Sequence, residues 1–541
     1  MQFAEVILHR RVPSRFESFT YEVPPQLAVM PGQIVQVPFR NQKLSAIVRR
    51  LHQTPVPYAV KPIEAAQPVT LPPWQMELAS WMSEHYACAF SKVIDLFIPE
   101  KIWEPGKRKS PAVEDQNQNS QAAFSLPIKQ NPDVENIIKK CLATGRTTLL
   151  IEKTPLPRKT FYDHVQRLIP KDSQALFLFP EIFSVLEFGA DLPKFHSELN
   201  ETQKAKMWNH TAAGEVKAIA GSRGALFLPF KNLSCIVVDF EDHESYHELR
   251  QPHYDAVEVA QKISQLLHIP LIIISRSPRT ETWHQAVSGT IEKCEWDTPP
   301  AASKVNIMDM ANERRKGNQG FFAEKTLEQT AKCLAQNEQI LFFVNRRGEA
   351  SALLCSDCGN ITRCAKCAGP LTLHTGNELQ CHRCKLHTPV PSFCASCKSV
   401  QLKKLGAGTQ RLEKEMAALF GKASIVRIDR ETVKDGWPKE KIAKADIIIA
   451  TQIIDKPLDL PRLKLAVVVF ADALLDFEDF RAGERAFQML THLQFLAKEH
   501  LFIQTFIPEQ ELFGQIQNGL ESFYNDELAT RKSLSLPPFD I

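Results

Sequence analysis

Short apolar runs of strand length alternate with helix-length amphipathic segments over most of the chain. Between residues 134 and 300 the strand-sized runs are TTLLIE, ALFLF, AIAG, CIVVDF and PLIIIS, with segments such as RKTFYDHVQRLI and YDAVEVAQKISQLL between them. This alternation is typical of a parallel sheet with helices on both faces. A second series between residues 301 and 541, namely QILFFVN, SIVRID, ADIIIAT and LAVVVFA, predicts another sheet of the same kind.

The first hundred residues follow a different pattern. TYEVP, QIVQVPF and LSAIVRR are predicted as strands separated by turns, and a helix is expected over about residues 73–89. From about residue 103 to 133 the chain is polar and rich in Lys, Asn, Gln, Ser and Pro, which is the composition of a linker. We therefore divide the chain into an N-terminal β domain (1–102), a linker (103–133) and two α/β lobes (134–300 and 301–541).

Composition narrows the class of protein. A chain of 541 residues is too long for one core, and its 44% hydrophobic and 23% charged content is ordinary for a globular protein. No apolar run approaches the length of a membrane span, and the start of the chain lacks a signal-peptide pattern. We expect a cytoplasmic protein without membrane contact. The net charge of +3 provides no global basic field, so a nucleic-acid site has to be a local patch.

Eight of the 13 cysteines form four Cys-x-x-Cys pairs, which are Cys355/Cys358, Cys364/Cys367, Cys381/Cys384 and Cys394/Cys397. Two such turns complete the tetrahedral thiolate shell that Zn²⁺ prefers, so the pairs predict two closed, structural zinc sites in a module over residues 353–400. Disulfides, a redox dithiol and an iron–sulfur cluster are the alternatives. Regular spacing in a chain without an export signal favours zinc.

The four pairs can combine sequentially, alternately or in a nested order. Only five residues separate Cys358 from Cys364, which leaves little room for two opposed turns. The longer stretch from Cys367 to Cys381 has the pattern of a hairpin. We favour nesting, in which one metal is held by Cys355, Cys358, Cys394 and Cys397 and the other by Cys364, Cys367, Cys381 and Cys384.

Further motifs occur in order along the chain: FTYEVP, PGQIVQVPF, GSRGALFLPFKNL, IVVDFEDHESYH, FVNRRG, GAGTQRLEKE, DFRAGERAFQMLTHL and LATRKSLSLPPF. Together with the cysteines they resemble the PriA family, the primosomal replication-restart DNA helicases. The resemblance implies a 3′-end-binding-like DNA domain over 1–102, a reduced winged-helix region over 103–133 and two RecA-like helicase lobes. It also implies a double-zinc insertion in the second lobe, with the nested assignment. The family continues into a C-terminal domain beyond PPF, and we expect that domain to be absent.

The residues that handle ATP in this family differ here. Helicases of this class cradle the phosphates in a glycine-rich loop after the first strand of lobe 1, and this chain has EKTPLPRKT there. Glu152, Pro155 and Pro157 stand at glycine positions, and Arg158 stands at the lysine position. Prolines remove N–H donors and fix φ, so we expect no working phosphate loop. The residues left for ATP and Mg²⁺ are Lys159, Thr160, Asp239 and Glu241.

Two other motifs have also lost side chains that the family uses for ATP hydrolysis. The family's Asp-Glu-x-His is Asp-Phe-Glu-Asp here, so that Phe240 replaces the carboxylate that would orient the attacking water. At the sixth motif, Leu496 and Glu499 stand at arginine positions that would stabilise the transferred phosphate. The resemblance therefore implies a helicase scaffold without support for hydrolysis.

The resemblance also suggests DNA contacts. Lys61 matches the family's lysine at the pocket for a nascent 3′ end. Arg40 stands there at a glycine position and Thr20 replaces an acidic acceptor, so we expect no specific capture of a 3′ hydroxyl and keep Arg40 as a candidate for a phosphate contact. Arg223 lies in a Gly-Ser-Arg stretch that touches the DNA backbone in related helicase lobes. Arg481 and Arg485 are further candidates for phosphate contacts.

We expect a zinc-stabilised primosome protein that binds forked or branched DNA, helps to load the replicative helicase and lacks ATP-driven helicase activity. The expected partners are primosome proteins, the replicative helicase or its loader, and single-stranded DNA-binding protein. One alternative is an active ATP-dependent 3′-to-5′ DNA helicase with atypical motifs. Another is a protein-interaction module that has left DNA altogether.

Overall fold

The computed structural model describes residues 2–9, 18–103, 131–188, 192–298, 303–345, 351–355, 357–358, 360, 362–366, 371–374, 378–381, 384–405, 409–429, 431–433, 437–455, 460–475 and 479–539. The described residues form two compact units, one of Met1–Ser275 with Gln285–Trp296 and one of Arg276–His284 with Asp297–Ile541. Residues 104–130 of the predicted linker lie outside the described ranges.

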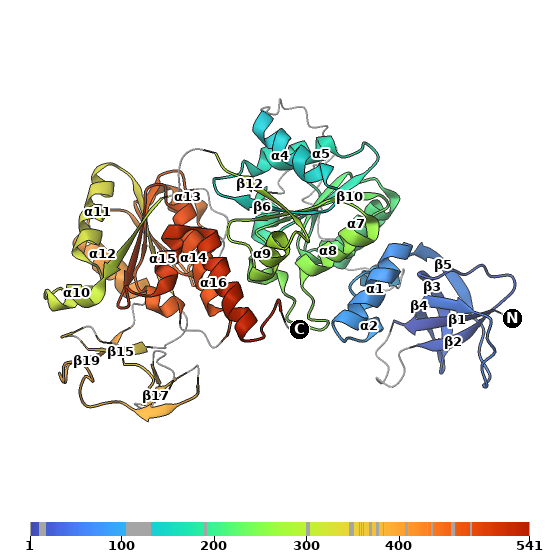
Figure 1. Cartoon of the computed structure of the whole chain (residues 1–541). Helices are drawn as coiled ribbons and strands as arrows, with labels where there is room; N and C mark the ends of the chain where they lie inside the picture. The colour runs from blue at the N-terminus through green and yellow to red at the C-terminus, as the bar shows by residue number, and fades with distance from the viewer. Residues whose placement is uncertain are drawn as a thin grey trace. The chain divides into compact units, whose positions relative to one another are not determined.

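The first unit begins with an antiparallel sheet in the order β2-β1-β4-β3-β5 (Figure 1). Its strands are β1 (Gln2–Leu8), β2 (Phe19–Val23), β3 (Gln33–Phe39), β4 (Gln42–His52) and β5 (Ala65–Thr70). The helices α1 (Pro73–His85), α2 (Phe90–Ile94) and α3 (Glu100–Trp103) follow. The buried Gln75 amide donates hydrogen bonds to the carbonyls of Phe227 and Leu228, so α1 is joined to the lobe that comes next in the same unit.

That lobe is a parallel sheet in the order β12-β6-β11-β10-β7-β9-β8. Its strands are β6 (Thr147–Glu152), β7 (Gln174–Leu178), β8 (Lys194–Phe195), β9 (Ala218–Gly221), β10 (Leu233–Asp239), β11 (Leu271–Ser275) and β12 (Glu292–Trp296). Every residue of β6, β7, β9 and β11 is buried, as expected for strands covered on both faces.

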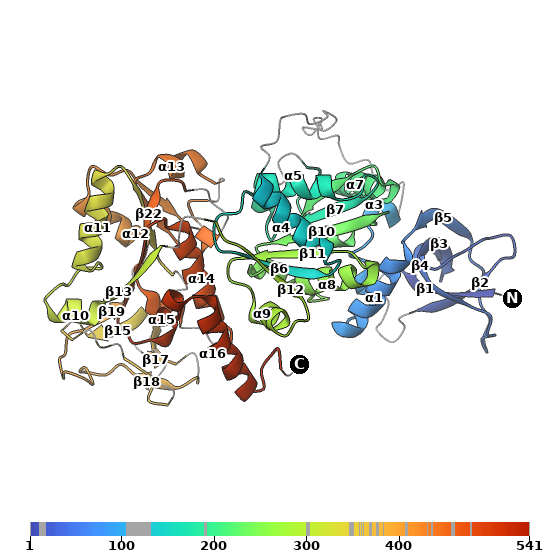
Figure 2. The same cartoon turned by 45° about the horizontal axis from the view of Figure 1, so that its top comes forward.

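The helices of this lobe are α4 (Pro132–Ala143), α5 (Arg158–Leu168), α6 (Ile182–Phe188), α7 (Glu201–Ala213) and α8 (Ala256–Leu267), while α9 (Thr280–Val287) is divided between the two compact units. Figure 2 shows α4 and α5 on one side of the sheet and α8 on the other. Strands β6 and β10 flank β11, so the segments after Glu152 and Asp239 leave the same carboxyl edge of the sheet.

The second unit contains a parallel sheet in the order β13-β23-β22-β14-β21-β20. Its strands are β13 (Lys304–Asp309), β14 (Gln339–Phe343), β20 (Ile425–Ile428), β21 (Ile447–Ala450), β22 (Leu463–Val468) and β23 (His500–Thr505). Its helices after α9 are α10 (Met310–Arg315), α11 (Glu324–Ala335), α12 (Thr409–Leu419), α13 (Lys439–Lys444), α14 (Ala482–Leu496), α15 (Glu511–Asn518) and α16 (Leu520–Ser533).

The cysteine-rich insertion forms a separate antiparallel sheet in the order β18-β17-β16-β15-β19. Its strands are β15 (Ser351–Cys355), β16 (Thr372–His374), β17 (Glu378–Gln380), β18 (His387–Pro389) and β19 (Leu402–Leu405). Pairing of β16 with β17 confirms the predicted hairpin between Cys367 and Cys381. The buried cluster of this sheet is small, with Leu353, Leu371, Leu373 and Leu379 beside two cysteines.

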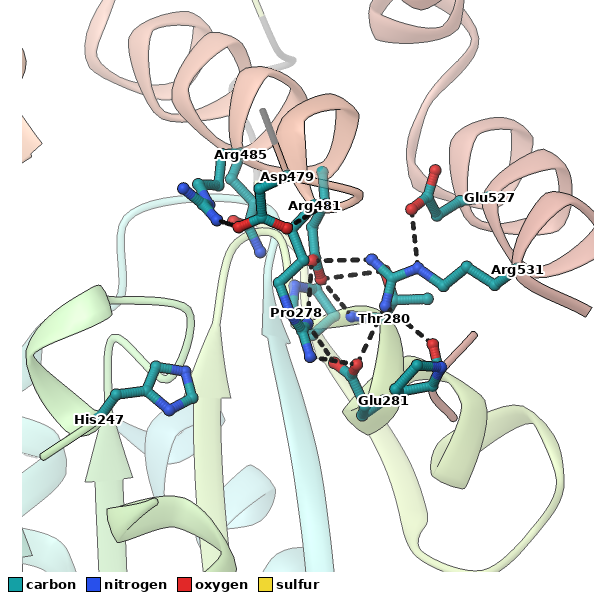
Figure 3. A network of polar contacts seen from close by, with 12 residues as sticks. His247, Pro278, Thr280, Glu281, Asp479, Arg481, Arg485, Glu527 and Arg531 are labelled. Atoms are coloured by element: carbon teal, nitrogen blue, oxygen red, sulfur yellow. Dashed lines mark hydrogen bonds and ion pairs between the residues drawn. The ribbon is translucent and has the colours of Figure 1, made fainter. Parts of the chain in front are cut away.

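A buried ion network joins three segments of the second unit (Figure 3). The Arg531 guanidinium on α16 contacts Glu281 at 3.0 Å, Glu484 at 2.9 Å and Glu527 at 2.8 Å. Arg481 also contacts Glu281 and Glu484, at 2.7 and 3.2 Å. Glu484 in addition accepts the backbone N–H of Thr280 at the start of α9.

This network explains why Arg276–His284, which follows a strand of the first lobe in sequence, belongs to the second compact unit. It also engages two residues that the sequence suggested as phosphate contacts. Arg481 is paired as described above, and Arg485 is paired with Asp479. Both guanidinium groups therefore already have carboxylate partners within the fold.

The predicted fold class is confirmed: a small β domain precedes two α/β lobes with parallel sheets typical of RecA-like helicases, and the second lobe carries a cysteine-rich insertion. The division into four sequence segments remains a prediction. Among the described residues, no helix is both long enough and apolar enough to cross a membrane.

Candidate functional site

The segment after β6, where the family's phosphate loop would lie, is closed around a carboxylate of the chain itself. The Glu152 side chain accepts the backbone N–H of Leu156 at 2.8 Å. It also accepts one hydrogen bond of 2.8 Å from each terminal nitrogen of Arg158. A bidentate guanidinium–carboxylate pair is among the stronger hydrogen-bonded contacts in proteins. An internal anion therefore occupies the turn between β6 and α5.

Arg158 is also paired with the end of β10. Its Nε lies 2.7 Å from Asp239 Oδ2 and its second terminal nitrogen lies 3.1 Å from Oδ1. The Tyr162 hydroxyl donates to the same carboxylate, and the backbone N–H of Phe240 does so at 3.0 Å. The carboxylate of Asp239, which a helicase would use to hold Mg²⁺, is thus surrounded by donors of this chain.

The network is enclosed. The side chains of Glu152 and Asp239 are 1% exposed and that of Arg158 is 8% exposed. The guanidinium carbon lies 4.3 Å from the ring centre of Phe240 and 5.8 Å from that of Phe188. We call Glu152, Arg158, Tyr162 and Asp239 the Arg158 network.

Burial and charge act on the pKa values of Arg158 and Tyr162 in this network. Burial alone would lower the pKa of Arg158, but Asp239 and Glu152 raise the pKa well above its usual value, so the guanidinium stays charged. Burial and the Asp239 carboxylate raise the pKa of Tyr162 well above its usual value, so its hydroxyl remains a donor. The result is one cation between two carboxylates.

The residues that the sequence offered for nucleotide differ in their exposure. Lys159 is exposed, and Thr160 beside it is half-buried at the start of α5. Glu241 is fully buried, and its backbone N–H donates to the carbonyl of Ile274 at 3.2 Å. Phe240 adopts a left-handed conformation with φ of 54°. Tyr162 was not identified from the sequence, because nothing in the chain marks a residue one helical turn beyond the loop as a partner of Asp239.

The cysteines gather in two groups. Ligand sulfurs of Cys355, Cys358, Cys394 and Cys397 all lie within 4.8 Å of one another, as do those of Cys364, Cys381 and Cys384. This is the nested arrangement. Cys367, the expected fourth member of the second group, lies outside the described residues.

The sulfur spacing suits a metal shell. Cys355 and Cys397 are 3.6 Å apart, Cys358 and Cys394 are 3.6 Å apart, and Cys364 and Cys384 are 3.4 Å apart. A tetrahedral shell with Zn–S bonds of about 2.3 Å places its sulfurs about 3.8 Å apart, whereas a disulfide bond is about 2.05 Å long. The described cysteines could therefore hold metal ions, and their all-sulfur donor sets are consistent with zinc.

Two of the turns share one backbone geometry. The N–H groups of Lys385 and Lys398 donate to the carbonyls of Cys381 and Cys394, at 2.8 and 3.0 Å. Both lysines have left-handed φ values, of 59° and 64°. Each turn thus points its two thiols at one position in advance of any metal.

The DNA-contact candidates lie in different surroundings. Arg40 is exposed at the end of β3, where its guanidinium lies 5.7 Å from the ring centre of Phe39. Lys61 is exposed, and its carbonyl accepts the N–H of Glu22 on β2. The rings of Phe19 and Phe39 meet at 5.1 Å, so the segments that carry these two candidates border the same end of the sheet. Arg223 is instead paired with Glu248 at 2.9 Å and donates to the carbonyl of Ser245.

Comparison with known proteins gives a consistent set of relatives. Residues 5–99 match the family model of the PriA 3′ DNA-binding domain. The chain is 31% identical over 446 residues to the replication restart protein PriA of Bacillus subtilis, which covers 77% of this chain and 54% of that relative. It is 29% identical over 554 residues to the protein of the same name from Rickettsia conorii, which covers 96% of this chain and 83% of that relative.

The chain thus spans about half the length of the first of these relatives and most of the second. It is also similar to a solved structure of RecG bound to a three-way DNA junction, with a TM-score of 0.41 and 12% identity. That match covers 75% of this chain and 48% of the RecG chain.

Replacing the central arginine tests how much the Arg158 network stabilises the first lobe. Arg158→Met leaves two buried carboxylates without a cation, which we expect to cost about 3–5 kcal/mol. Hydrogen exchange of the β6 and α5 amides should report this as a lower free energy of opening. The control is Arg167→Met on the exposed side of the same helix. Equal protection in the two variants would show that the network contributes no stability.

Proposed function

Because this chain belongs to the PriA family of replication restart proteins, we propose that it binds forked or branched DNA as a zinc-stabilised scaffold without an ATP-driven motor. The relatives carry the name replication restart protein, and we extend that role to this chain. Within it, the protein helps to load the replicative helicase and contacts that helicase or its loader, other primosome proteins and single-stranded DNA-binding protein.

The loss of the motor is supported above all by the Glu152 carboxylate in the turn after β6. A nucleotide needs free backbone N–H groups and an uncompensated cation at this place. Here the N–H of Leu156 and the guanidinium of Arg158 are both bonded to Glu152. A bound phosphate would have to displace a buried carboxylate and would lie beside its negative charge. Pro155 and Pro157 supply no N–H groups to compensate.

DNA binding is supported by the N-terminal domain. Residues 5–99 match a family model whose description is a 3′ DNA-binding domain. Exposed Arg40 and Lys61 give its sheet two cations at one end, suited to phosphate contacts. We propose that this domain makes the principal contact with the fork. Arg223, which is paired with Glu248, would contribute only after exchanging that partner.

Two zinc ions are supported by the donor sets of the cysteine groups. A shell of four thiolates leaves no position for water or substrate, so each ion would stabilise the fold and perform no chemistry. The small apolar cluster of the insertion is consistent with a stabilising role for zinc, because a module with so little buried apolar surface needs additional cross-links such as metal coordination.

The affinity for DNA should depend steeply on salt. We expect the full chain to bind a labelled fork in fluorescence anisotropy, with log K falling linearly against log salt concentration. Arg40→Ala combined with Lys61→Ala should weaken binding and reduce the slope by about 1.8, since each duplex phosphate contact contributes about 0.9. Lys171→Ala, an exposed lysine of the first lobe, is the control. Absent or salt-insensitive binding by the unaltered chain would refute the proposal.

ATP turnover separates the scaffold from an active helicase. We expect no DNA-stimulated hydrolysis by zinc-loaded protein above the background of a Lys159→Ala variant, measured as phosphate release with and without forked DNA. The helicase alternative requires turnover that disappears in both Lys159→Ala and Glu241→Gln. That result would overturn the proposal, whatever the affinity for DNA.

Metal content tests the assignment of the cysteines. Elemental analysis of the purified chain should give two zinc ions per molecule. Cys364→Ser should retain one, because the remaining thiolates of the second group no longer complete a shell. Cys333→Ser alters a buried cysteine outside both groups and should retain two. Iron in place of zinc, or an unchanged count in Cys364→Ser, would contradict the assignment.

A further inference from the structure

The turn of the last cysteine pair carries an exposed aromatic side chain. Phe393 directly precedes Cys394 and is 52% exposed, and Val400 beyond the turn is 72% exposed. The Nζ atom of Lys398 lies 5.5 Å from the ring centre of Phe393. We call Phe393, Lys398 and Val400 the Phe393 face. A phenylalanine in this position contributes nothing to the buried cluster of the module, which does not include it.

The backbone under the Phe393 face is tightly constrained. The N–H of Cys394 donates to the carbonyl of Ser399 at 2.7 Å, and the N–H of Lys398 donates back to the carbonyl of Cys394. The Lys398 ammonium donates to the carbonyl of Ala395 at 3.3 Å. Ser399 in turn donates its hydroxyl to Asp357 of the first turn. The ring and the ammonium are thus presented on a preformed turn, so ordering them on binding costs little.

The module has more basic than acidic side chains. Residues 353–400 contain five lysines and arginines, namely Arg363, Lys366, Arg383, Lys385 and Lys398, against the two carboxylates of Asp357 and Glu378. Both carboxylates already have partners, since Asp357 accepts from Ser399 and Glu378 lies 3.4 Å from His387. Two metal shells of four thiolates each would add negative charge of their own, so the cation that matters for this face is Lys398, which lies directly beside the exposed ring.

We propose that the Phe393 face binds single-stranded DNA, with one base stacked on the Phe393 ring and the adjoining backbone phosphate beside Lys398. An aromatic platform next to a fixed cation is the combination that single-strand binding sites use, because every base has a face to stack and every nucleotide has a phosphate. A protein partner of acidic character would pair with the lysines but would leave the exposed ring without a specific role.

Single strands are favoured over duplex by the same geometry. Paired bases are stacked on one another, so a lone ring on a turn reaches them only after they separate. A duplex would contact Lys398 and leave Phe393 unused. This inference rests on the proposed function, because it assigns to the cysteine module the unpaired strand of a fork whose paired region the N-terminal domain holds.

The test measures binding of a labelled oligothymidylate and of a duplex of the same length to the full, zinc-loaded chain. Phe393→Ala should weaken oligothymidylate binding by about 5- to 100-fold, as expected for one lost stack, and leave duplex binding unchanged. Phe393→Trp should restore single-strand binding, because the larger ring stacks at least as well. Leu249→Ala removes an exposed apolar side chain of the first unit and should have no effect on either ligand.

Lys398→Ala should act differently from Phe393→Ala. The loss of one phosphate contact should reduce the slope of log K against log salt by about 0.7 for a single strand, whereas loss of the ring should lower K and leave the slope unchanged. Lys422→Ala, an exposed lysine outside the module, is the matched control. Zinc content measured on each variant shows that the module is intact.

Each outcome decides between the two proposals. If the chain binds no DNA of any kind, the proposed function fails and this inference fails with it. If forks bind with a normal salt slope but Phe393→Ala leaves oligothymidylate binding unaltered, only this inference is overturned. Equal losses for duplex and single strand in Phe393→Ala would also overturn it, because a stacking site cannot act on paired bases.

Discussion

A single buried arginine determines how the carboxyl edge of the first lobe is built. Arg158 begins α5, and its guanidinium joins Glu152 at the end of β6 to Asp239 at the end of β10 across the intervening β11. A charge with so little exposure is tolerable only with partners, so the two strand ends and the helix have to keep their relative positions. The same contacts engage the N–H of Leu156 and the guanidinium of Arg158, two donors at the place where the family's phosphate loop would lie.

The cysteine-rich insertion of the second lobe has a much smaller apolar core than the main sheet of that lobe. The main sheet has a continuous core, while the cysteine module has few buried leucines and gathers its described cysteines in two groups that could hold metal ions. Metal coordination fixes short segments without a large apolar interior, which leaves side chains such as Phe393 free to face solvent.

The sequence pattern was informative where burial is uniform. Strands such as β6, β7 and β11 are continuous apolar runs and were identified directly. The edge strands β12 and β13 were not identified, because only Cys294 and Trp296 of β12 are buried, no residue of β13 is, and no apolar run results. Strand β23 was missed although it is central, and its buried Gln504 and Thr505 interrupt the apolar pattern. The cysteine spacing anticipated its groups, whereas the pairing of Arg158 with Asp239, 81 residues away, depends on tertiary approach that no local pattern encodes.

The carboxylate of Glu152 is a ligand covalently attached to its own site, so its effective concentration never changes. A motor loses and regains its nucleotide in every cycle, and these events determine when it binds DNA tightly and when it releases it. In the scaffold proposed here Glu152 fills the equivalent position, so the ratio of ATP to ADP would not alter the fold of this lobe. The residence time of such a protein on a fork would be set by the dissociation of its contacts alone, and release would have to come from a competing partner or from repair of the fork itself.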